Sequence, residues 1–324
     1  MKSDDYIDGF SSQSKDFDKI KPYMNDIICK DVSNWSNEWY DSILPENNKL
    51  SLKFKQWDAE FKGKLRGMLV PIIGYGGTKK SLLSLNIAYE NITRGLGKCI
   101  YSTMEMGATQ IINRLIDMHV KPNSDEHNAH AELEYHNNVT RSLNAKKFFD
   151  SEFSPAFKGN FHITENTSLQ TESYDKLLTK FKDNNIQIDI LIVDGLAGMG
   201  GKGSEVELYS KHSKELKDLA NKWKILVFLI CHVSKGGKKT DRDLSGLVRS
   251  SEKIIDNCDF YITASLFEDK NNNNEYDKNY GALRLINKRG TGNTIDVVYD
   301  FYMRRLLMEG TDMDFAQFEK TNGM

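Results

Sequence analysis

Short apolar runs alternate with helical stretches along most of the chain, and this alternation is the strongest constraint on the fold. The runs at 68–73, 98–102 and 188–193 have the length and apolar character of buried strands. The stretch at 205–223 has the apolar spacing of a helix. Strands that alternate with helices at this spacing form a mostly parallel, twisted sheet with helices on both faces. The sequence therefore predicts an α/β fold.

The other expected elements continue this pattern and then change it after Asp259. Two more strands are expected at 161–164 and 225–231, and four more helices at 82–88, 108–120, 174–182 and 244–257. Further along, apolar runs follow one another with short turns, at 260–266, 282–287, 294–299 and 303–308. Successive strands joined by short turns pair in antiparallel hairpins, so we expect the sheet to end in C-terminal antiparallel hairpins.

The first 50 residues differ from the rest of the chain. They mix Asp, Ser, Asn and Lys with isolated aromatic residues and contain no clear strand. A segment of this size and polarity buries too little apolar surface to fold alone. We therefore expect two parts. One is a helical arm at 1–50, whose aromatic side chains pack on the main body or on a neighbouring subunit, and the other is a single domain at 51–324.

The charge balance excludes a protein that is basic overall. The chain has 44 Lys and Arg against 46 Asp and Glu, which gives a formal net charge of −2. A chain that coats nucleic acid over its whole surface would carry a large positive charge. A near-neutral protein with one local basic loop stays compatible with this balance.

The cysteines and the N-terminus indicate a protein of the cytoplasm, or of the host cytoplasm if the source is viral. The four cysteines lie far apart without metal-site spacing, and Cys99 and Cys231 lie in apolar runs, as buried thiols do. The polar, acidic N-terminus is unlike a signal peptide. The apolar run at 225–233 is shorter than the ~20 residues that span a bilayer, so we expect no membrane association.

A glycine-rich segment from Gly74 to Ser81 reads Gly-Tyr-Gly-Gly-Thr-Lys-Lys-Ser and lies between an expected strand and an expected helix. In this setting the pattern G-x-x-x-x-G-K-[ST] binds nucleoside triphosphates, because backbone N–H groups and a helix N-terminus face the phosphates. The sequence therefore predicts a site for ATP and Mg²⁺. The expected nucleotide-binding residues are Gly74, Gly76, Gly77, Thr78, Lys79, Lys80 and Ser81.

Three side chains of this segment decide how well it can work. Lys80 is expected to reach the β- and γ-phosphates, and the Ser81 hydroxyl to bind Mg²⁺. Lys79 stands where the pattern has its second glycine, which permits close approach of the backbone and unusual dihedral angles. Lys79 therefore either adds positive charge beside the nucleotide or distorts the loop and weakens ATP binding.

Three polar residues follow other expected strands. Asp194 ends one apolar strand, the place of an acid that helps to hold Mg²⁺. Glu105 follows a second strand, where it can orient or deprotonate an attacking water, and His232 follows a third, where it can contact a γ-phosphate. Each has an ordinary structural alternative, as a helix cap or as a packed imidazole. Together they are expected at the carboxyl ends of the strands, where open α/β sheets bind ligands.

Four stretches of the chain follow the motif order of a known family. They are Ser102-Thr-Met-Glu-Met106, Asp189-Ile-Leu-Ile-Val-Asp194, Cys231-His-Val-Ser234 and Leu285-Ile-Asn-Lys-Arg-Gly-Thr-Gly292. With the glycine-rich segment, they resemble the ATPase domain of DnaB-type replicative helicases, RecA-like hexameric motors that include phage proteins. The resemblance runs from about Ser51 to Met308. It implies a RecA-like P-loop core and an ATP-dependent replicative DNA helicase, which forms a ring, translocates on single-stranded DNA and unwinds duplex.

The resemblance also implies roles for individual side chains. Glu105 matches the family's catalytic base, and His232 its γ-phosphate sensor. Arg289 matches an arginine finger, which completes the ATP site of the neighbouring subunit. The family's companion lysine falls on Asn287, and Lys288 beside it would face the opposite side of a strand.

Two basic loops are candidates for contacts with DNA. The first, from Ser234 to Arg242, follows the expected γ-phosphate sensor, and in the resembling family this loop lines the central channel. The second follows Asp194 and contains Lys202. Lysines bind the phosphates of single-stranded DNA without reading its sequence, and glycines let backbone N–H groups approach them. The expected DNA-binding residues are Lys202, Lys235, Gly236, Gly237, Lys238, Lys239 and Arg242.

Two other functions stay open from the sequence. Lys79 and Asn287 depart from the ATP site of the resembling family, which would suit a DNA-binding or scaffold protein with a degenerate ATP site. The other alternative is a recombination or loader-type ATPase that acts on DNA without unwinding it. For a helicase, the expected partners are single-stranded DNA, further copies of the chain on which the arm at 1–50 docks, and a primase, polymerase or helicase loader. The Asn- and Lys-rich composition favours a phage source.

Overall fold

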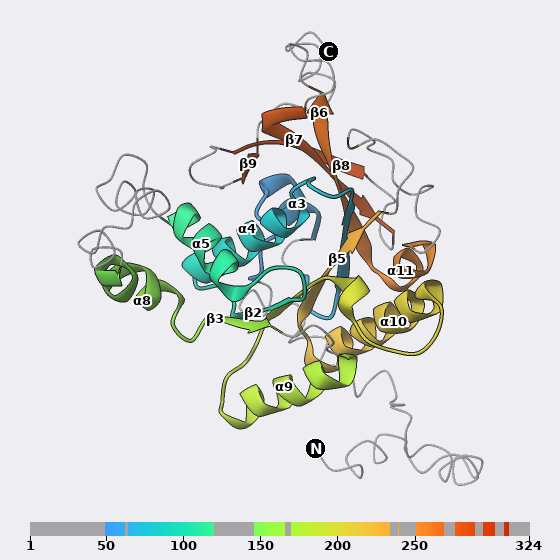
Figure 1. Ribbon diagram of the computed structural model, residues 1–324, viewed down its shortest axis with the longest axis horizontal. Helices are drawn as coiled ribbons and strands as arrows, with labels where there is room; N and C mark the ends of the chain where they lie inside the picture. Colours follow the sequence, from blue (N-terminus) through green and yellow to red (C-terminus); the bar gives the residue numbers. More distant parts are fainter. Residues whose placement is uncertain are drawn as a thin grey trace, which may run out of the picture. The chain divides into compact units, whose positions relative to one another are not determined.

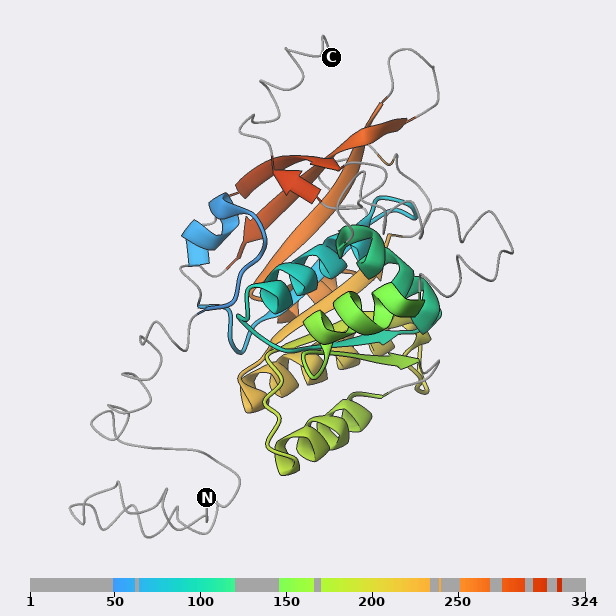
Figure 2. The ribbon, with the colours of Figure 1, turned by 90° about the vertical axis from the view of Figure 1, so that its left-hand side faces the viewer.

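The protein is built on a twisted β-sheet with helices on both faces, as the computed structural model shows from two directions (Figure 1 and Figure 2). The structure describes residues 49–61, 64–119, 146–165, 170–233, 239, 251–268, 276–288, 294–301 and 308–310. The strands are β1 (Leu69–Gly74), β2 (Cys99–Thr103), β3 (Phe161–Glu165), β4 (Ile190–Asp194), β5 (Leu226–His232), β6 (Phe260–Glu268), β7 (Tyr276–Asn287), β8 (Thr294–Phe301) and β9 (Met308–Gly310).

The described residues form one nine-stranded sheet in the order β3-β2-β4-β5-β1-β6-β7-β8-β9. The strands from β3 to β6 in this order pair in parallel. The remaining pairs, from β6 to β9, are antiparallel. The predicted mostly parallel sheet with C-terminal antiparallel hairpins is therefore confirmed.

Helices cover both faces of the sheet because its central strands are apolar on both sides. All residues of β1 and β4 are buried, a pattern that requires cover on each face. One face carries α3 (Lys55–Phe61), α4 (Lys80–Thr93), α5 (Ala108–His119), the π-helix η5 (Phe149–Phe153) and α8 (Ser154–Phe157). The other face carries α9 (Thr171–Asp183), the short η6 (Leu196–Gly198), α10 (Glu205–Trp223) and α11 (Ser251–Asn257).

Several expected boundaries differ from the observed ones. The expected strand at 303–308 overlaps β9 only at Met308, and 303–307 lie outside the described residues. The expected helix at 244–257 is described only as α11, and the expected arm lies almost wholly outside the described residues. The helices α3, η5 and α8 were not expected. They are short, and each buries only one or two side chains, so they carry little periodic signal.

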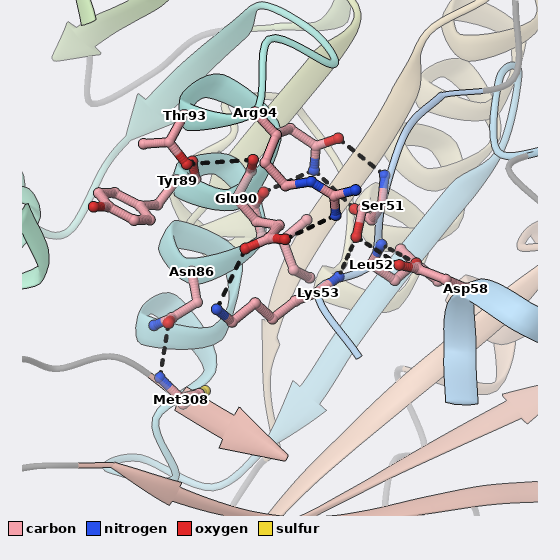
Figure 3. Close-up of polar contacts among 12 residues, drawn as sticks. Ser51, Leu52, Lys53, Asp58, Asn86, Tyr89, Glu90, Thr93, Arg94 and Met308 are labelled. Atoms are coloured by element: carbon pink, nitrogen blue, oxygen red, sulfur yellow. Dashed lines mark hydrogen bonds and ion pairs between the residues drawn. The ribbon is translucent and has the colours of Figure 1, made fainter. Parts of the chain in front are cut away.

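The glycine-rich turn is held in place through the helix that follows it. In Figure 3, the side-chain oxygen of Asn86 in α4 accepts a hydrogen bond of 2.8 Å from the backbone N–H of Met308 in β9. The fully buried Asn91 in the same helix bonds both the N–H and the carbonyl of Ser51, at 2.9 and 2.8 Å. Because α4 is fixed to two other segments, its N-terminus, which closes the turn, is fixed as well.

Two further findings bear on the sequence-based expectations. Cys99 and Cys231 are buried free thiols, as predicted, and burial raises the pKa of Cys231 to about 12. In the part of the chain that the structure describes, none of the helices has the length and apolar character needed to cross a membrane.

Candidate nucleotide-binding site

The parallel register brings the predicted site residues to one edge of the sheet. Gly74 at the end of β1 pairs with His232 at the end of β5. Thr103 at the end of β2 pairs with Asp194 at the end of β4. Since β2, β4, β5 and β1 are consecutive neighbours, their carboxyl ends form one continuous edge, the usual ligand-binding edge of such sheets.

The glycine-rich segment forms a tight turn between β1 and α4. The hydroxyl of Thr78 donates to the carbonyl of Tyr75 at 2.9 Å, and the ammonium of Lys80 folds back to the same carbonyl at 2.8 Å. A Cβ on Gly74 would lie 2.5 Å from the Thr78 hydroxyl, which no side chain could tolerate. Gly77 has a φ of +82°, in the left-handed region that favours glycine. Beside Gly76, a Cβ would meet no atom within 4 Å, so this part of the turn is open.

Lys79 adopts the left-handed conformation that glycine would adopt without cost. Its φ is 67° and its ψ 19°, and it is the N-cap of α4. For a residue with a side chain, this conformation costs about 1–2 kcal/mol. Burial lowers the pKa of Lys79, and the nearby charges of Arg114 and Lys239 lower it further. Lys79 therefore keeps the turn geometry at the expense of strain and also adds positive charge.

Lys80, His232 and Glu105 form a continuous series of contacts. The ammonium of Lys80 lies 3.4 Å from Nδ1 of His232, and Nε2 of His232 lies 3.1 Å from Oε1 of Glu105. Lysine only donates hydrogen bonds and a carboxylate only accepts them. A neutral imidazole with its proton on Nε2 satisfies both contacts.

Lys80 is the buried member of this series. Burial lowers its pKa from the ordinary value of 10.5 to about 8, although the charges of Glu105 and Asp194 act in the opposite direction. The side chains of His232 and Glu105 are 42% and 43% exposed, so they line the open side of the site.

Asp194 is fully buried, and its two carboxylate oxygens differ in their hydrogen bonding. The hydroxyl of Tyr101 in β2 donates to its Oδ2 at 2.6 Å, whereas Oδ1 is buried without a hydrogen-bond partner among the described residues. Burial raises the pKa of Asp194, while the hydroxyls of Tyr101 and Ser81 lie against the same carboxylate and lower it. A buried carboxylate oxygen without a partner is costly unless a cation offsets its charge. The donor set of Ser81 and Asp194 therefore fits Mg²⁺, which binds proteins through one or two carboxylates together with substrate phosphates.

Tyr101 is the member of the site that the sequence reading missed. It lies within the strand expected at 98–102 and was given no role of its own. The available signal was the phenol itself, because a tyrosine hydroxyl in a fully buried strand usually needs a hydrogen-bond partner.

Among the described residues, the others singled out in the sequence lie outside this group of contacting side chains. Lys202 is exposed in the segment before α10. Lys239, which we expected to bind DNA, has its ammonium beside Gly77 of the glycine-rich turn. Asn287 and Lys288 face opposite sides, as predicted: Asn287 donates to Glu60 of α3, and Lys288 to a carbonyl of α11. Outside the described residues lie Lys235, Gly236, Gly237, Lys238, Arg242 and Arg289.

The strain at Lys79 predicts an inverted order of stability for two substitutions. Lys79→Gly and Lys79→Ala remove the same charge, but only glycine relieves the left-handed backbone. We expect the Gly variant to be more stable than the Ala variant by about 1 kcal/mol, measured by urea unfolding. The same pair at Lys214, exposed within α10, is the control, and there Ala should be more stable by about 1 kcal/mol. Equal stability of the two Lys79 variants would contradict the strain.

The pKa of Lys80 predicts a pH dependence of nucleotide binding. A bound phosphate raises the pKa of this group above about 8, because its negative charge favours the ammonium. Binding then takes up a proton above pH 8, so affinity falls as the pH rises, by up to about tenfold per pH unit. Fluorescent ADP titrated without Mg²⁺ between pH 7 and 10 measures this fall. Lys80→Arg stays charged throughout and should lack it; the same profile in both proteins would refute the assignment.

The chain was also compared with known protein families. The profile of the DnaB-like helicase C-terminal domain matches residues 50–306, which is most of the chain. A comparison with curated protein sequences finds no match.

Solved structures share the fold. One solved ATPase domain has a TM-score of 0.63 at 16% identity, and the match covers 93% of this chain and 99% of that domain. A DnaB-like replicative helicase, described together with its interactions with primase, has a TM-score of 0.63 at 17% identity. That match covers 86% of this chain and 67% of the helicase. The predicted RecA-like core is thus confirmed, and the family match extends over the glycine-rich turn, Glu105, Asp194 and His232. The chain belongs to the family of the DnaB-like helicase C-terminal domain.

Proposed function

We propose that the chain is the motor of an ATP-dependent replicative DNA helicase, which forms a ring, moves along single-stranded DNA and unwinds duplex. The observation that carries this proposal is the contact series Lys80–His232–Glu105 beside the buried Asp194. These contacts connect the carboxyl ends of β5 and β2 with the N-terminus of α4, at one edge of the sheet. Membership of the helicase family supports the same function.

The chain's own residues account for nucleotide binding. The backbone N–H groups of the glycine-rich turn would hold the phosphates, with Lys80 as a charged donor. Ser81 and Asp194 would hold Mg²⁺, with the free Oδ1 of Asp194 as the ligand atom. Bound Mg²⁺ supplies positive charge that stabilises the charge developed during phosphoryl transfer.

Glu105 and His232 would connect phosphate binding to the chemical step. Glu105 carries its carboxylate on the open side of the site, where it can take a proton from the attacking water. His232 touches both Glu105 and Lys80, so movement of the Lys80 ammonium toward a phosphate would break one of its two contacts. His232 would then reorient and change the position of Glu105.

The same histidine would connect hydrolysis to DNA. His232 is the last residue of β5, and the basic segment 234–242 follows it directly in the chain. A displacement of His232 is therefore transmitted through the backbone to residues proposed to bind single-stranded DNA. Because lysines contact phosphates and not bases, this binding would be independent of sequence.

A ring is proposed because the resemblance implies that each ATP site is completed by an arginine of the neighbouring subunit. Transfer of a phosphoryl group is accelerated strongly by an arginine supplied from outside, and Arg289 of a neighbouring subunit is the proposed finger. The arm at 1–50 is proposed to dock on that neighbour. A primase, polymerase or helicase loader is the proposed class of protein partner.

Two observations favour a second candidate function. Asn287 occupies the place of the family's companion lysine and is bonded to Glu60, and Lys79 is strained. A DNA-binding or scaffold protein with a degenerate ATP site would tolerate both features. The loader-type ATPase stays the other alternative, separated from a helicase by a strand-displacement assay.

ATP hydrolysis in the presence of single-stranded DNA tests the proposal. Glu105→Gln removes the proposed base and should lower the hydrolysis rate by about 10²–10⁴-fold, while ADP affinity stays within about twofold. Glu172→Gln, an exposed residue of α9 paired with Lys176, is the matched control and should keep the wild-type rate. If the wild type shows no DNA-stimulated hydrolysis, or if Lys80→Ala leaves the rate unchanged, the proposal of a motor is wrong.

A further inference from the structure

Lys239 lies beside the glycine-rich turn although the chain places it in the basic segment 234–242. Its backbone carbonyl accepts a hydrogen bond of 2.9 Å from the N–H of Leu266 in β6. Strand β6 is the direct neighbour of β1, whose end opens the turn. The backbone of Lys239 is therefore attached to the sheet next to the proposed nucleotide site.

The side chain of Lys239 extends onto the turn itself. A Cβ built on Gly77 would lie 3.3 Å from the Lys239 ammonium. Gly77 has no side chain and a φ of +82°, so the ammonium faces peptide backbone at the point where N–H groups are expected to meet phosphates. An ammonium placed beside the turn in this way can donate to an anion held there.

Other cations surround the same place. The charges of Arg114 in α5 and of Lys239 both act on Lys79, so each of them lies within electrostatic range of Lys79. Lys80 occupies the inner side of the same turn. Like charges brought together repel, and an anion with several negative charges offsets this cost. The arrangement fits a polyphosphate better than a single phosphodiester.

We propose that Lys239 binds a phosphate of the nucleotide held by the glycine-rich turn of its own subunit. This inference rests on the proposed nucleotide site and adds a ligand to it from a segment otherwise expected to contact DNA. The source of the phosphate is the nucleotide and not the DNA backbone.

If Lys239 binds the nucleotide, the position of the basic segment 234–242 depends directly on whether nucleotide is bound. One residue of the segment is held at the turn when phosphate is bound, independently of the path through His232. Coupling between two ligands is reciprocal, so DNA bound by the segment changes nucleotide affinity by the same factor.

Binding of fluorescent ADP and of ATPγS to the full chain without DNA tests the assignment. Lys239→Ala should weaken both affinities by about tenfold, because it removes a charged hydrogen bond to phosphate. Lys239→Arg should stay within about threefold of the wild type, since it keeps the charge. Lys176→Ala removes an equal charge from the exposed surface of α9 and is the control, expected to match the wild type.

A second measurement distinguishes phosphate of the nucleotide from phosphate of the DNA backbone. In Lys239→Ala, the affinity for labelled oligo-dT without nucleotide should change by less than about threefold. High salt should reduce the difference in ADP affinity between Lys239→Ala and the wild type, because salt screens the charge of Lys239. Unchanged ADP affinity in Lys239→Ala overturns the assignment, and a loss confined to oligo-dT binding returns Lys239 to the DNA surface.

The outcomes also separate this inference from the proposed function. If Lys80→Ala abolishes ADP binding and Lys239→Ala leaves ADP affinity unchanged, only the role of Lys239 is wrong. If the wild type binds no ADP, the nucleotide site and the role of Lys239 fail together. Lys239→Gln, which keeps most of the side chain, replaces the Ala variant if thermal unfolding shows that Lys239→Ala is not folded.

Discussion

The parallel register of four central strands is the constraint on which the site depends. Gly74 pairs with His232 and Thr103 with Asp194, so the ends of β1, β5, β2 and β4 meet at one edge. Successive residues of a strand face opposite sides, so a slip of one residue would turn a site side chain to the other face. The contacts among Lys80, His232 and Glu105 depend on this register. The register is fixed because the apolar residues of these strands are buried.

The turn at 74–81 shows that a motif can lose a residue type and keep its geometry. Lys79 takes the backbone conformation that the motif's glycine would take, and the buried asparagines of α4 fix the helix that closes the turn. The cost is local strain, and the gain is a further positive charge at the proposed phosphate site. The departure at this position therefore does not by itself indicate a degenerate site.

The sequence predicted the elements better than the contacts between them. Periodicity and the apolar runs indicated the parallel strands and the later hairpins, because these patterns are local. The bond from Tyr101 to Asp194 joins residues 93 apart, and the placement of Lys239 against Gly77 depends on β6 lying beside β1. Local sequence patterns do not determine the order of strands in a sheet, so such contacts could not be predicted from the sequence. The roles of Arg289 and of the arm at 1–50 stay predictions.

Strand displacement from a forked duplex by mixtures of wild-type and Arg289→Ala subunits tests the proposed helicase function. It depends at once on ATP hydrolysis, on translocation and on sites shared between subunits. We expect the wild type to displace the strand only with hydrolysable ATP, and the variant to reduce the rate by more than its share of the mixture. A wild type that hydrolyses ATP without displacing the strand, or a loss in proportion to the variant, would contradict the proposal.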